Sequence, residues 1–169
     1  MLIVFQAMNQ INFGQLMDVY EETNHIRGEE EYPNLFPEER RVRIEQNLYA
    51  YIRENLYAQK NGFCCVWAPE GRYVAALRME QYKDGWLLTA LETDPAARNK
   101  GYGKALVNAV LTYMAEQGAS AIYTHVNKQN KASLAVHYAC GFQRLLEYAV
   151  FLDGSVSQKF YTLYTKLSK

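Results

Sequence analysis

The stretch Asp94-Pro-Ala-Ala-Arg-Asn-Lys-Gly-Tyr-Gly-Lys-Ala-Leu106 decides the fold. An apolar run at residues 86–91 leads into it, and an amphipathic segment at residues 104–117 leads out of it, which predicts a strand, a glycine turn and a helix. The first N–H groups of a helix lack intrahelical partners, and the helix dipole adds positive potential there. Because glycine lets the backbone approach a ligand closely, we expect this turn to bind an anion, in particular a pyrophosphate.

Two familiar phosphate-binding patterns do not fit the turn. A P-loop needs Ser or Thr after its Gly-Lys pair and another glycine five residues before that pair, whereas Ala105 and Arg98 stand at these places. The dinucleotide fingerprint needs a third glycine where this chain has Leu106. Phosphoryl and nucleotide chemistry are therefore weak alternatives.

The composition is that of a globular protein, and 169 residues fit a single domain, residues 1–169. Lys plus Arg and Asp plus Glu both number 18, so the net charge of zero argues against a nucleic-acid partner. No signal peptide begins the chain and no apolar stretch approaches a membrane span, so we expect a cytoplasmic protein without a membrane partner. Cys64, Cys65 and Cys140 have neither disulfide nor zinc-ligand spacing, which predicts buried free thiols and no metal.

Hydrophobic periodicity and turn residues divide the rest of the chain. Strands in sequence joined by short turns predict an antiparallel meander, and the strand–helix–strand unit after it is typical of parallel pairing. Residues 25–37 look irregular, because they hold Gly28, two prolines and an acidic run. The fold class is therefore α+β. We expect strands at 2–5, 63–68, 73–80, 86–93, 121–126, 144–151 and 159–166, and helices at 13–24, 37–59, 103–117 and 130–140.

Two motifs in this order resemble those of the GNAT superfamily of acetyl-CoA-dependent N-acetyltransferases. The first is Arg98-x-x-Gly101-x-Gly103. The second is Asn130-Lys-Ala-Ser-Leu-Ala-Val-His-Tyr-Ala-Cys-Gly-Phe142, which is similar to the family's Asn-x-x-Ala-x-x-x-Tyr-x-x-x-Gly-Phe. The resemblance covers most of the chain. It implies a central, mostly antiparallel mixed sheet of about seven strands with about four helices, in which the strands at 86–93 and 121–126 splay apart.

The resemblance also implies where acetyl-CoA, the co-substrate, would bind. Backbone N–H groups of residues 99–104 would hold the pyrophosphate, and the pantetheine arm would pair with the strand near residues 91–93 as an added strand does. For Lys100 a solvated surface charge is an equal alternative. The implied coenzyme-binding residues are Leu91, Thr93, Arg98, Asn99, Lys100, Gly101, Tyr102, Gly103, Lys104 and Asn130.

Acetyl transfer requires the amine to lose a proton and the departing thiolate to gain one. Glu92, near the end of an apolar strand, is the candidate base, because burial would raise its pKa; the alternative is a carboxylate that points to solvent. The family's usual acid is a tyrosine, but His137 stands at its position and Tyr138 one residue later. One helical residue is a rotation of about 100°, so both cannot face the sulfur. We expect His137→Ala to lower turnover more than Tyr138→Phe; the alternative for His137 is a packing role.

The acceptor site is expected in the segment that holds Glu29, Glu30 and Glu31, with Tyr32 and Phe36 nearby, because an acidic and aromatic rim suits a cationic amine. The alternative is a solvated charge run. The sequence thus predicts an N-acetyltransferase that acts on a small-molecule or a peptide or protein amine, with a homodimer as a further expectation. The alternative class is an acyl-CoA-binding sensor or scaffold with little turnover.

Overall fold

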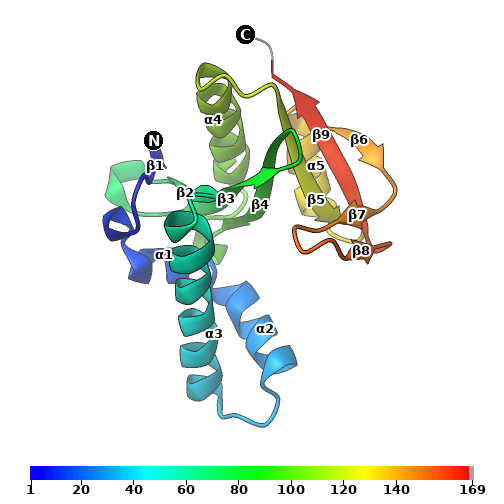
Figure 1. The fold of residues 1–169 in the computed structure, drawn as a ribbon. Helices are drawn as coiled ribbons and strands as arrows, with labels where there is room; N and C mark the ends of the chain where they lie inside the picture. The colour runs from blue at the N-terminus through cyan, green and yellow to red at the C-terminus, as the bar shows by residue number, and fades with distance from the viewer. Residues whose placement is uncertain (168–169) are drawn as a thin grey trace.

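A seven-stranded mixed sheet forms the centre of the protein, in the strand order β1-β2-β3-β4-β5-β9-β6 (Figure 1). The computed structural model describes residues 1–167. All neighbours in the sheet are antiparallel except β4 and β5, which are parallel. The strands of this sheet are β1 Leu2–Val4, β2 Gly62–Trp67, β3 Ala75–Tyr82, β4 Gly85–Thr93, β5 Ala121–Asn127, β6 Gln143–Leu146 and β9 Phe160–Lys166. The predicted fold class is confirmed.

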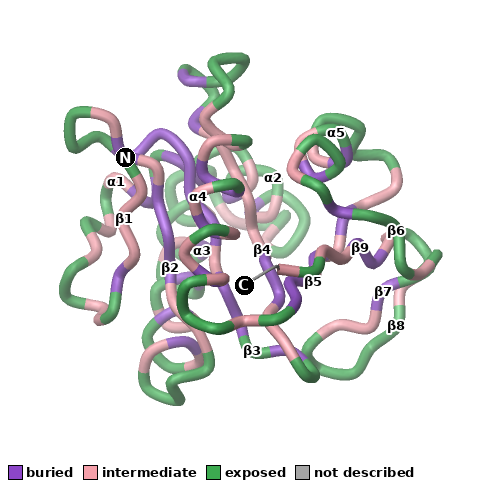
Figure 2. The backbone as a smooth tube through the Cα atoms, turned by 90° about the horizontal axis from the view of Figure 1, so that it is seen from above, coloured by how far each residue is buried: buried purple, intermediate pink, exposed green. Residues whose placement is uncertain are grey.

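Helices cover both faces of the sheet, and each face has its own core (Figure 2). The helices α4 Tyr102–Glu116 and α5 Lys131–Ala139 pack on one face, around Leu106, Val107, Leu77 and Leu88. The other face carries α1 Phe13–Val19, part of α3 Pro37–Tyr51 and the π-helical segment Ile52–Ala58 that continues it. Cys64 belongs to this second core and Cys65 to the first, because successive strand residues point to opposite faces.

The sheet opens between β4 and β5, as the resemblance implied. Their ladder runs from Trp86↔Ile122 to Leu88↔Thr124 and has no further pair, although both strands continue. In the same part of β4 the register with β3 shifts, and Ala90 takes a left-handed φ of 51°. This bulge adds a residue to β4 and increases its local bend. The edge of β4 that faces β5 is therefore unpaired from residue 89 onward.

The bulge also decides which way the end of β4 points its side chains. Glu92 lies opposite Ala76, which packs in the core beneath α1 and α3. Thr93 lies opposite Ala75, which packs in the core beneath α4. Because paired residues of neighbouring strands share a face, Glu92 and Thr93 open toward opposite sides of the sheet.

The prediction of an irregular segment at residues 25–37 was wrong for residues 25–31, because α2 spans Glu21–Glu31, and right for residues 32–36, which connect α2 to α3. The expected single helix at 13–24 is instead two helices that meet at Tyr20, so the structure has five α-helices where about four were expected. Gly28 does not end α2. It is buried, and a Cβ at its position would lie 3.2 Å from the Cβ of Arg40. Glycine thus allows α2 and α3 to approach closely as the helical pair that extends from the sheet in Figure 1.

The expected strand at 144–151 is broken in two. Its first part, β6, pairs with β9. Its second part, β7 Ala149–Val150, leaves the sheet and pairs with β8 Val156–Ser157 around the Asp153-Gly154 turn. Phe151 follows β7 and packs edge-on against His125 of β5. This contact holds the small hairpin over the end of the sheet.

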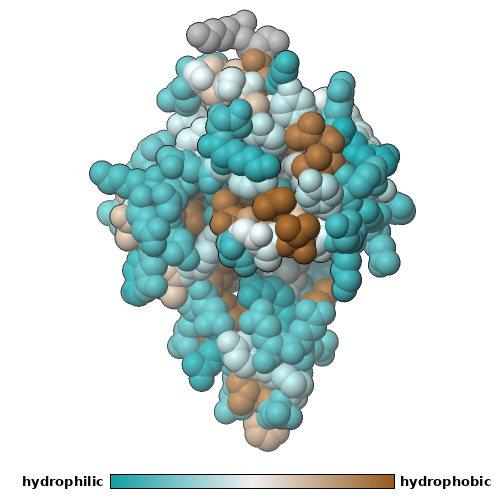
Figure 3. Space-filling model, turned by 45° about the vertical axis from the view of Figure 1, so that its right-hand side comes forward, coloured by the Kyte–Doolittle hydropathy of each residue, from teal (hydrophilic) through white to brown (hydrophobic). Residues whose placement is uncertain are grey.

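The surface is mainly hydrophilic, with separate apolar patches on the face that Figure 3 shows. Within residues 1–167, no helix is both long enough and apolar enough to cross a membrane. The exposed large apolar side chains lie mainly in two parts of the chain, around α2 and α3, as Phe36 does, and between β6 and β8, as Val156 does.

Candidate active site

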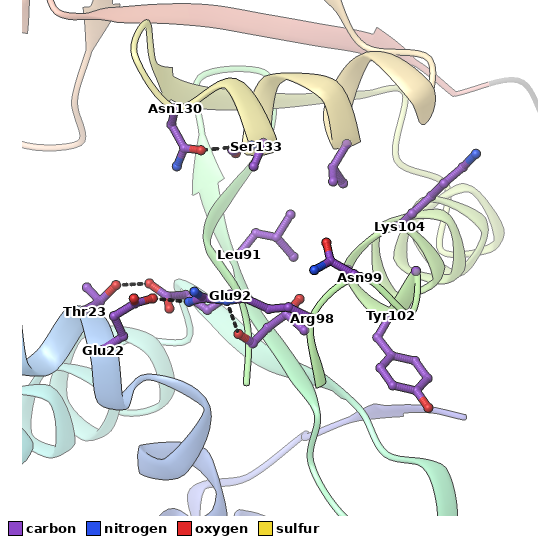
Figure 4. A pocket seen from close by; sticks show the side chains of 15 residues that line it. Glu22, Thr23, Leu91, Glu92, Arg98, Asn99, Tyr102, Lys104, Asn130 and Ser133 are labelled. Atoms are coloured by element: carbon purple, nitrogen blue, oxygen red, sulfur yellow. Dashed lines mark hydrogen bonds and ion pairs between the residues drawn. The ribbon is translucent and has the colours of Figure 1, made fainter. Parts of the chain in front are cut away.

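A cavity of about 580 Å³ opens where β4 separates from β5 (Figure 4). It extends from the turn before α4 to the first part of α2, with α5 along one side. Most of its lining comes from the stretch between Asp94 and Leu106 and from the second motif, which contains Asn130 and α5. The lining residues are Glu22, Thr23, Leu91, Glu92, Thr93, Arg98, Asn99, Gly101, Tyr102, Gly103, Lys104, Asn130, Ala132, Ser133 and Val136.

The turn before α4 presents a row of free backbone donors. Among the described residues, the N–H groups of residues 99–104 donate no hydrogen bond, and the first bond of the helix is Ala105 N to Gly101 O at 2.9 Å. Asn99 and Gly101 hold left-handed φ values of 62° and 79°, which the Gly101 position tolerates without strain. Asp94 closes the start of the turn, because its Oδ1 accepts from Ala96 N at 2.9 Å. Such a nest at a helix N-terminus suits a phosphate or pyrophosphate.

Charged side chains surround this anion cradle, by which we mean the backbone of residues 99–104. Lys104 and Arg98 both line the cavity, and Arg98 Nε donates to Thr93 O at 3.4 Å. The Arg98 guanidinium also forms an ion pair with Glu22 of α2. Lys100 is exposed and does not line the cavity. All other residues of the implied coenzyme site do line it.

Asn130 supports the opposite wall. Its side-chain oxygen accepts a hydrogen bond from Ser133 N at 2.9 Å, so Asn130 is the N-cap of α5. Capping fixes the first turn of this helix, and that turn brings Ala132 and Ser133 to the cavity. The side chain of Asn130 thus sets the position of α5 relative to the open edge of β4.

Glu92 lies at the end of the cavity that α2 covers. Burial raises the pKa of its carboxyl group, while the hydrogen bond from Thr23 and the charge of Arg98 oppose that rise. Thr23 Oγ1 donates to Glu92 Oε1. Glu92 Oε2 accepts no hydrogen bond from any residue that the structure describes. A half-buried carboxylate with one oxygen held and one free has the form of a general base.

His137 and Tyr138 do not line the cavity. His137 is 1% exposed, its Nδ1 donates to Ser133 O at 2.8 Å, and its ring packs edge-on against Phe142. Burial lowers the pKa of His137, so the ring is neutral and its one N–H is already used. Tyr138 is 42% exposed on another side of α5. The arrangement gives the expected acid role of these two residues no support, because Val136 occupies the wall of the cavity instead.

The contribution of α2 to the cavity was not predicted from the sequence. Glu29, Glu30 and Glu31 are exposed and lie outside the cavity, whereas Glu22 and Thr23 line it. No local pattern marks these two residues, since they lie within the stretch 13–24 that was expected to form a single helix. Ser133 had a weak signal, because it lies one turn after the cap residue of the second motif.

The cysteines on the sheet are buried, and their thiols do not line the cavity. Burial raises the pKa of the Cys64 thiol to about 11 and raises that of Cys65 as well, so neither is a ready nucleophile. Within residues 1–167 no group of three His, Cys, Asp or Glu side chains is placed to hold a metal ion.

Comparisons with known proteins agree with this geometry. The chain belongs to the acetyltransferase (GNAT) family, whose model matches residues 20–142. A mycothiol acetyltransferase of Renibacterium salmoninarum is 40% identical over 50 residues, which span 30% of this chain but only 15% of that protein. The chain therefore matches a small part of this curated relative.

Solved structures show the same fold at low sequence identity. The PaiA N-acetyltransferase of Thermoplasma acidophilum, in complex with coenzyme A, aligns with a TM-score of 0.66 and 13% identity over 98% of this chain and 99% of that one. The ribosomal-protein-S18-alanine N-acetyltransferase of Escherichia coli aligns with a TM-score of 0.64 and 16% identity over 100% and 96%. The resemblance read from the two motifs is confirmed at the level of family and fold.

Proposed function

We propose that the protein is an N-acetyltransferase that transfers an acetyl or other short acyl group from acetyl-CoA to a primary amine, within one domain spanning residues 1–169. The observation that carries the proposal is a single cavity with the anion cradle at one end and Glu92 at the other. The cradle binds the coenzyme, and Glu92 accepts a proton from the acceptor. Coenzyme binding and proton acceptance, which must both occur next to the thioester carbonyl, are thus placed in the same cavity.

The donor half of the proposal rests on the fit of this cavity to coenzyme A. The pyrophosphate would receive hydrogen bonds from the free N–H groups of residues 99–104, with Lys104 adding positive charge. The pantetheine arm would lie against the unpaired edge of β4 at residues 91–93 and use its backbone groups, as a strand does. Gly103 has no side chain, which lets the start of α4 lie close to Thr93 of β4. A Cβ at position 103 would lie 3.2 Å from Thr93 Oγ1.

Transfer would proceed by direct attack in a ternary complex. The amine nitrogen forms a bond to the thioester carbonyl carbon, the carbon–sulfur bond breaks, and the coenzyme leaves as a thiolate. Glu92 Oε2 takes the proton that the amine loses. A thiol has a pKa of about 8.5, so the thiolate is a good leaving group and can take its proton from water without a placed acid.

The acceptor is a primary amine, and its approach would be from the α1–α3 side of the sheet, toward which Glu92 points. The candidates are a small-molecule amine and a peptide or protein amine. A homodimer and a cytoplasmic location stay predictions. The three cysteines, which are all free, suit a reducing compartment.

The second candidate is an acyl-CoA-binding sensor or scaffold of the same fold. The observation that favours it is that His137 and Tyr138 are not among the residues that line the cavity, so the expected acid role of these two residues has no support from their position. The same assay separates the two functions.

The test is release of coenzyme A thiol from acetyl-CoA over a panel of amines. The panel holds polyamines, amino sugars, free amino acids and a peptide with an N-terminal alanine, the acceptor type in the name of the Escherichia coli neighbour. Enzymatic transfer predicts release above hydrolysis for at least one acceptor, with the acetylated product found by mass spectrometry. Tight acetyl-CoA binding without acceptor-dependent release would favour the sensor.

A further inference from the structure

Two adjacent residues of α2 reach across the sheet to the site. Thr23 donates to Glu92, which is 69 residues away in the sequence, and Glu22 pairs with Arg98 next to the anion cradle. Figure 4 shows both contacts at the same end of the cavity. α2 is thus the element that covers Glu92, with the hydroxyl of Thr23 bound to it and the carboxylate of Glu22 bound to Arg98 nearby.

The charges around Glu92 are few. Glu22 repels a negative Glu92, Arg98 attracts it, and the buried hydroxyl of Tyr20 lies nearby, bound to Ala90 O at 2.9 Å. Among the described residues, Thr23 is the one hydrogen-bond donor to the carboxylate. A threonine hydroxyl can donate only one hydrogen bond, and Thr23 donates it to Glu92.

We propose that Thr23 is a positioning residue whose hydroxyl holds one oxygen of Glu92 so that the other faces the acceptor amine. The inference rests on the proposed function, because it takes Glu92 to be the base. A glutamate side chain that bends freely would present either oxygen, or neither, to the amine. Holding Oε1 from α2 leaves Oε2 in the cavity, which is where the amine must lose its proton.

The same hydrogen bond favours the charged form of Glu92. Burial raises the pKa of this carboxyl group and the Thr23 hydroxyl limits the rise. Removing the hydroxyl therefore raises the pKa further. A hydrogen bond to a charged group is strong enough to expect an upward shift of about one pH unit, which is about tenfold in the ionisation constant.

The experiment compares Thr23→Val, which keeps the shape and loses the hydroxyl, with Thr23→Ser, which keeps the hydroxyl. A third variant, Glu22→Gln, removes the neighbouring negative charge and frees Arg98, so it must move the pKa of Glu92 downward. Two readouts are used: the acid limb of kcat/KM for one acceptor, and a carbon-13 NMR titration in which the Glu92 signal is assigned by its loss in Glu92→Gln. The ammonium titration of the acceptor is common to all variants and cancels between them.

The expected result is an upward shift of about one pH unit for Thr23→Val in both readouts, the wild-type value for Thr23→Ser, and a downward shift for Glu22→Gln. If α2 merely came loose in the variants, Glu92 would become exposed and its pKa would fall in both Thr23→Val and Glu22→Gln. An unchanged or lowered pKa in Thr23→Val overturns the inference. A different outcome is that the wild type acetylates no amine although the NMR titrations show the expected pKa shifts. The proposed function then fails, and so does the inference that Thr23 orients a catalytic base. The hydrogen bond from Thr23 to the Glu92 carboxylate would stand.

Discussion

Replacing Gly101 by alanine should change the shape of the anion cradle, and hence coenzyme binding, much more than it changes the stability of the fold. Gly101 has a φ of 79°, and a Cβ at its position would meet nothing within 4 Å. The cost is therefore conformational: an L-residue in the left-handed region loses about 1–2 kcal/mol, and the reduced freedom of the unfolded chain returns about 0.4–1 kcal/mol. We expect the free energy of unfolding to fall by about 1 kcal/mol, and Tm by roughly 2–4 °C for a chain of this length.

The same change should weaken coenzyme binding much more than it weakens the fold. Relaxation of residue 101 toward negative φ turns at least one N–H group of the cradle away from the pyrophosphate. A hydrogen bond to a charged group contributes about 1.5–3 kcal/mol, so the Kd for acetyl-CoA should rise at least about tenfold. Titration calorimetry with acetyl-CoA measures the Kd, and urea denaturation measures the stability.

Gly154 provides the matched control. It has a φ of 84° and equally open space around its Cβ position, but it lies in the β7–β8 turn and does not line the cavity. Gly154→Ala should lower stability by a similar amount, about 1 kcal/mol, and leave the Kd for acetyl-CoA unchanged. Equal Kd values for the two variants would refute the assignment of the cradle to the pyrophosphate.

Three further predictions follow from the site and the core. Glu92→Gln should lower acceptor turnover by about 100- to 10,000-fold at neutral pH and leave the Kd for acetyl-CoA within about twofold; a variant with more than a tenth of wild-type thiol release would exclude Glu92 as the base. Gly28→Val should destabilise the protein by about 1–3 kcal/mol in urea denaturation, because its side chain would push α2 from α3, and an unchanged midpoint would contradict the close approach of these helices. A thiol reagent should label half-buried Cys140 in the native protein, and Cys64 and Cys65 only after unfolding, as mass spectrometry would show.

The features that could be predicted from the sequence are the ones that consecutive residues carry. The anion cradle is a local structure: a strand, two glycines and a helix start lie within the stretch from Asp94 to Leu106. The cap at Asn130 is local as well, since its hydrogen bond joins residues only three positions apart. Apolar runs and turn residues were enough for the strands of the main sheet, but not for the break between β6 and β7 in the expected strand at 144–151.

The features that were missed depend on contacts between distant segments. Gly28 looked like a helix breaker, but its role is the contact with Arg40 in α3, which only the folded chain shows. The hydrogen bond from Thr23 to Glu92 joins residues that are 69 positions apart, and the sequence around one gives no indication of contact with the other. The rotation of α5 is decided by the packing of His137 against Phe142, so the motif position alone could not say which side chain would face the cavity.

The most direct test of the central claim is a crystal structure of the protein with coenzyme A. The proposed function predicts pyrophosphate oxygens at hydrogen-bond distance, about 3 Å, from the N–H groups of residues 99–104, the pantetheine arm against β4 at residues 91–93, and the sulfur beside Glu92. Coenzyme bound elsewhere, or bound with its sulfur on the side of the cavity away from Glu92, would contradict it.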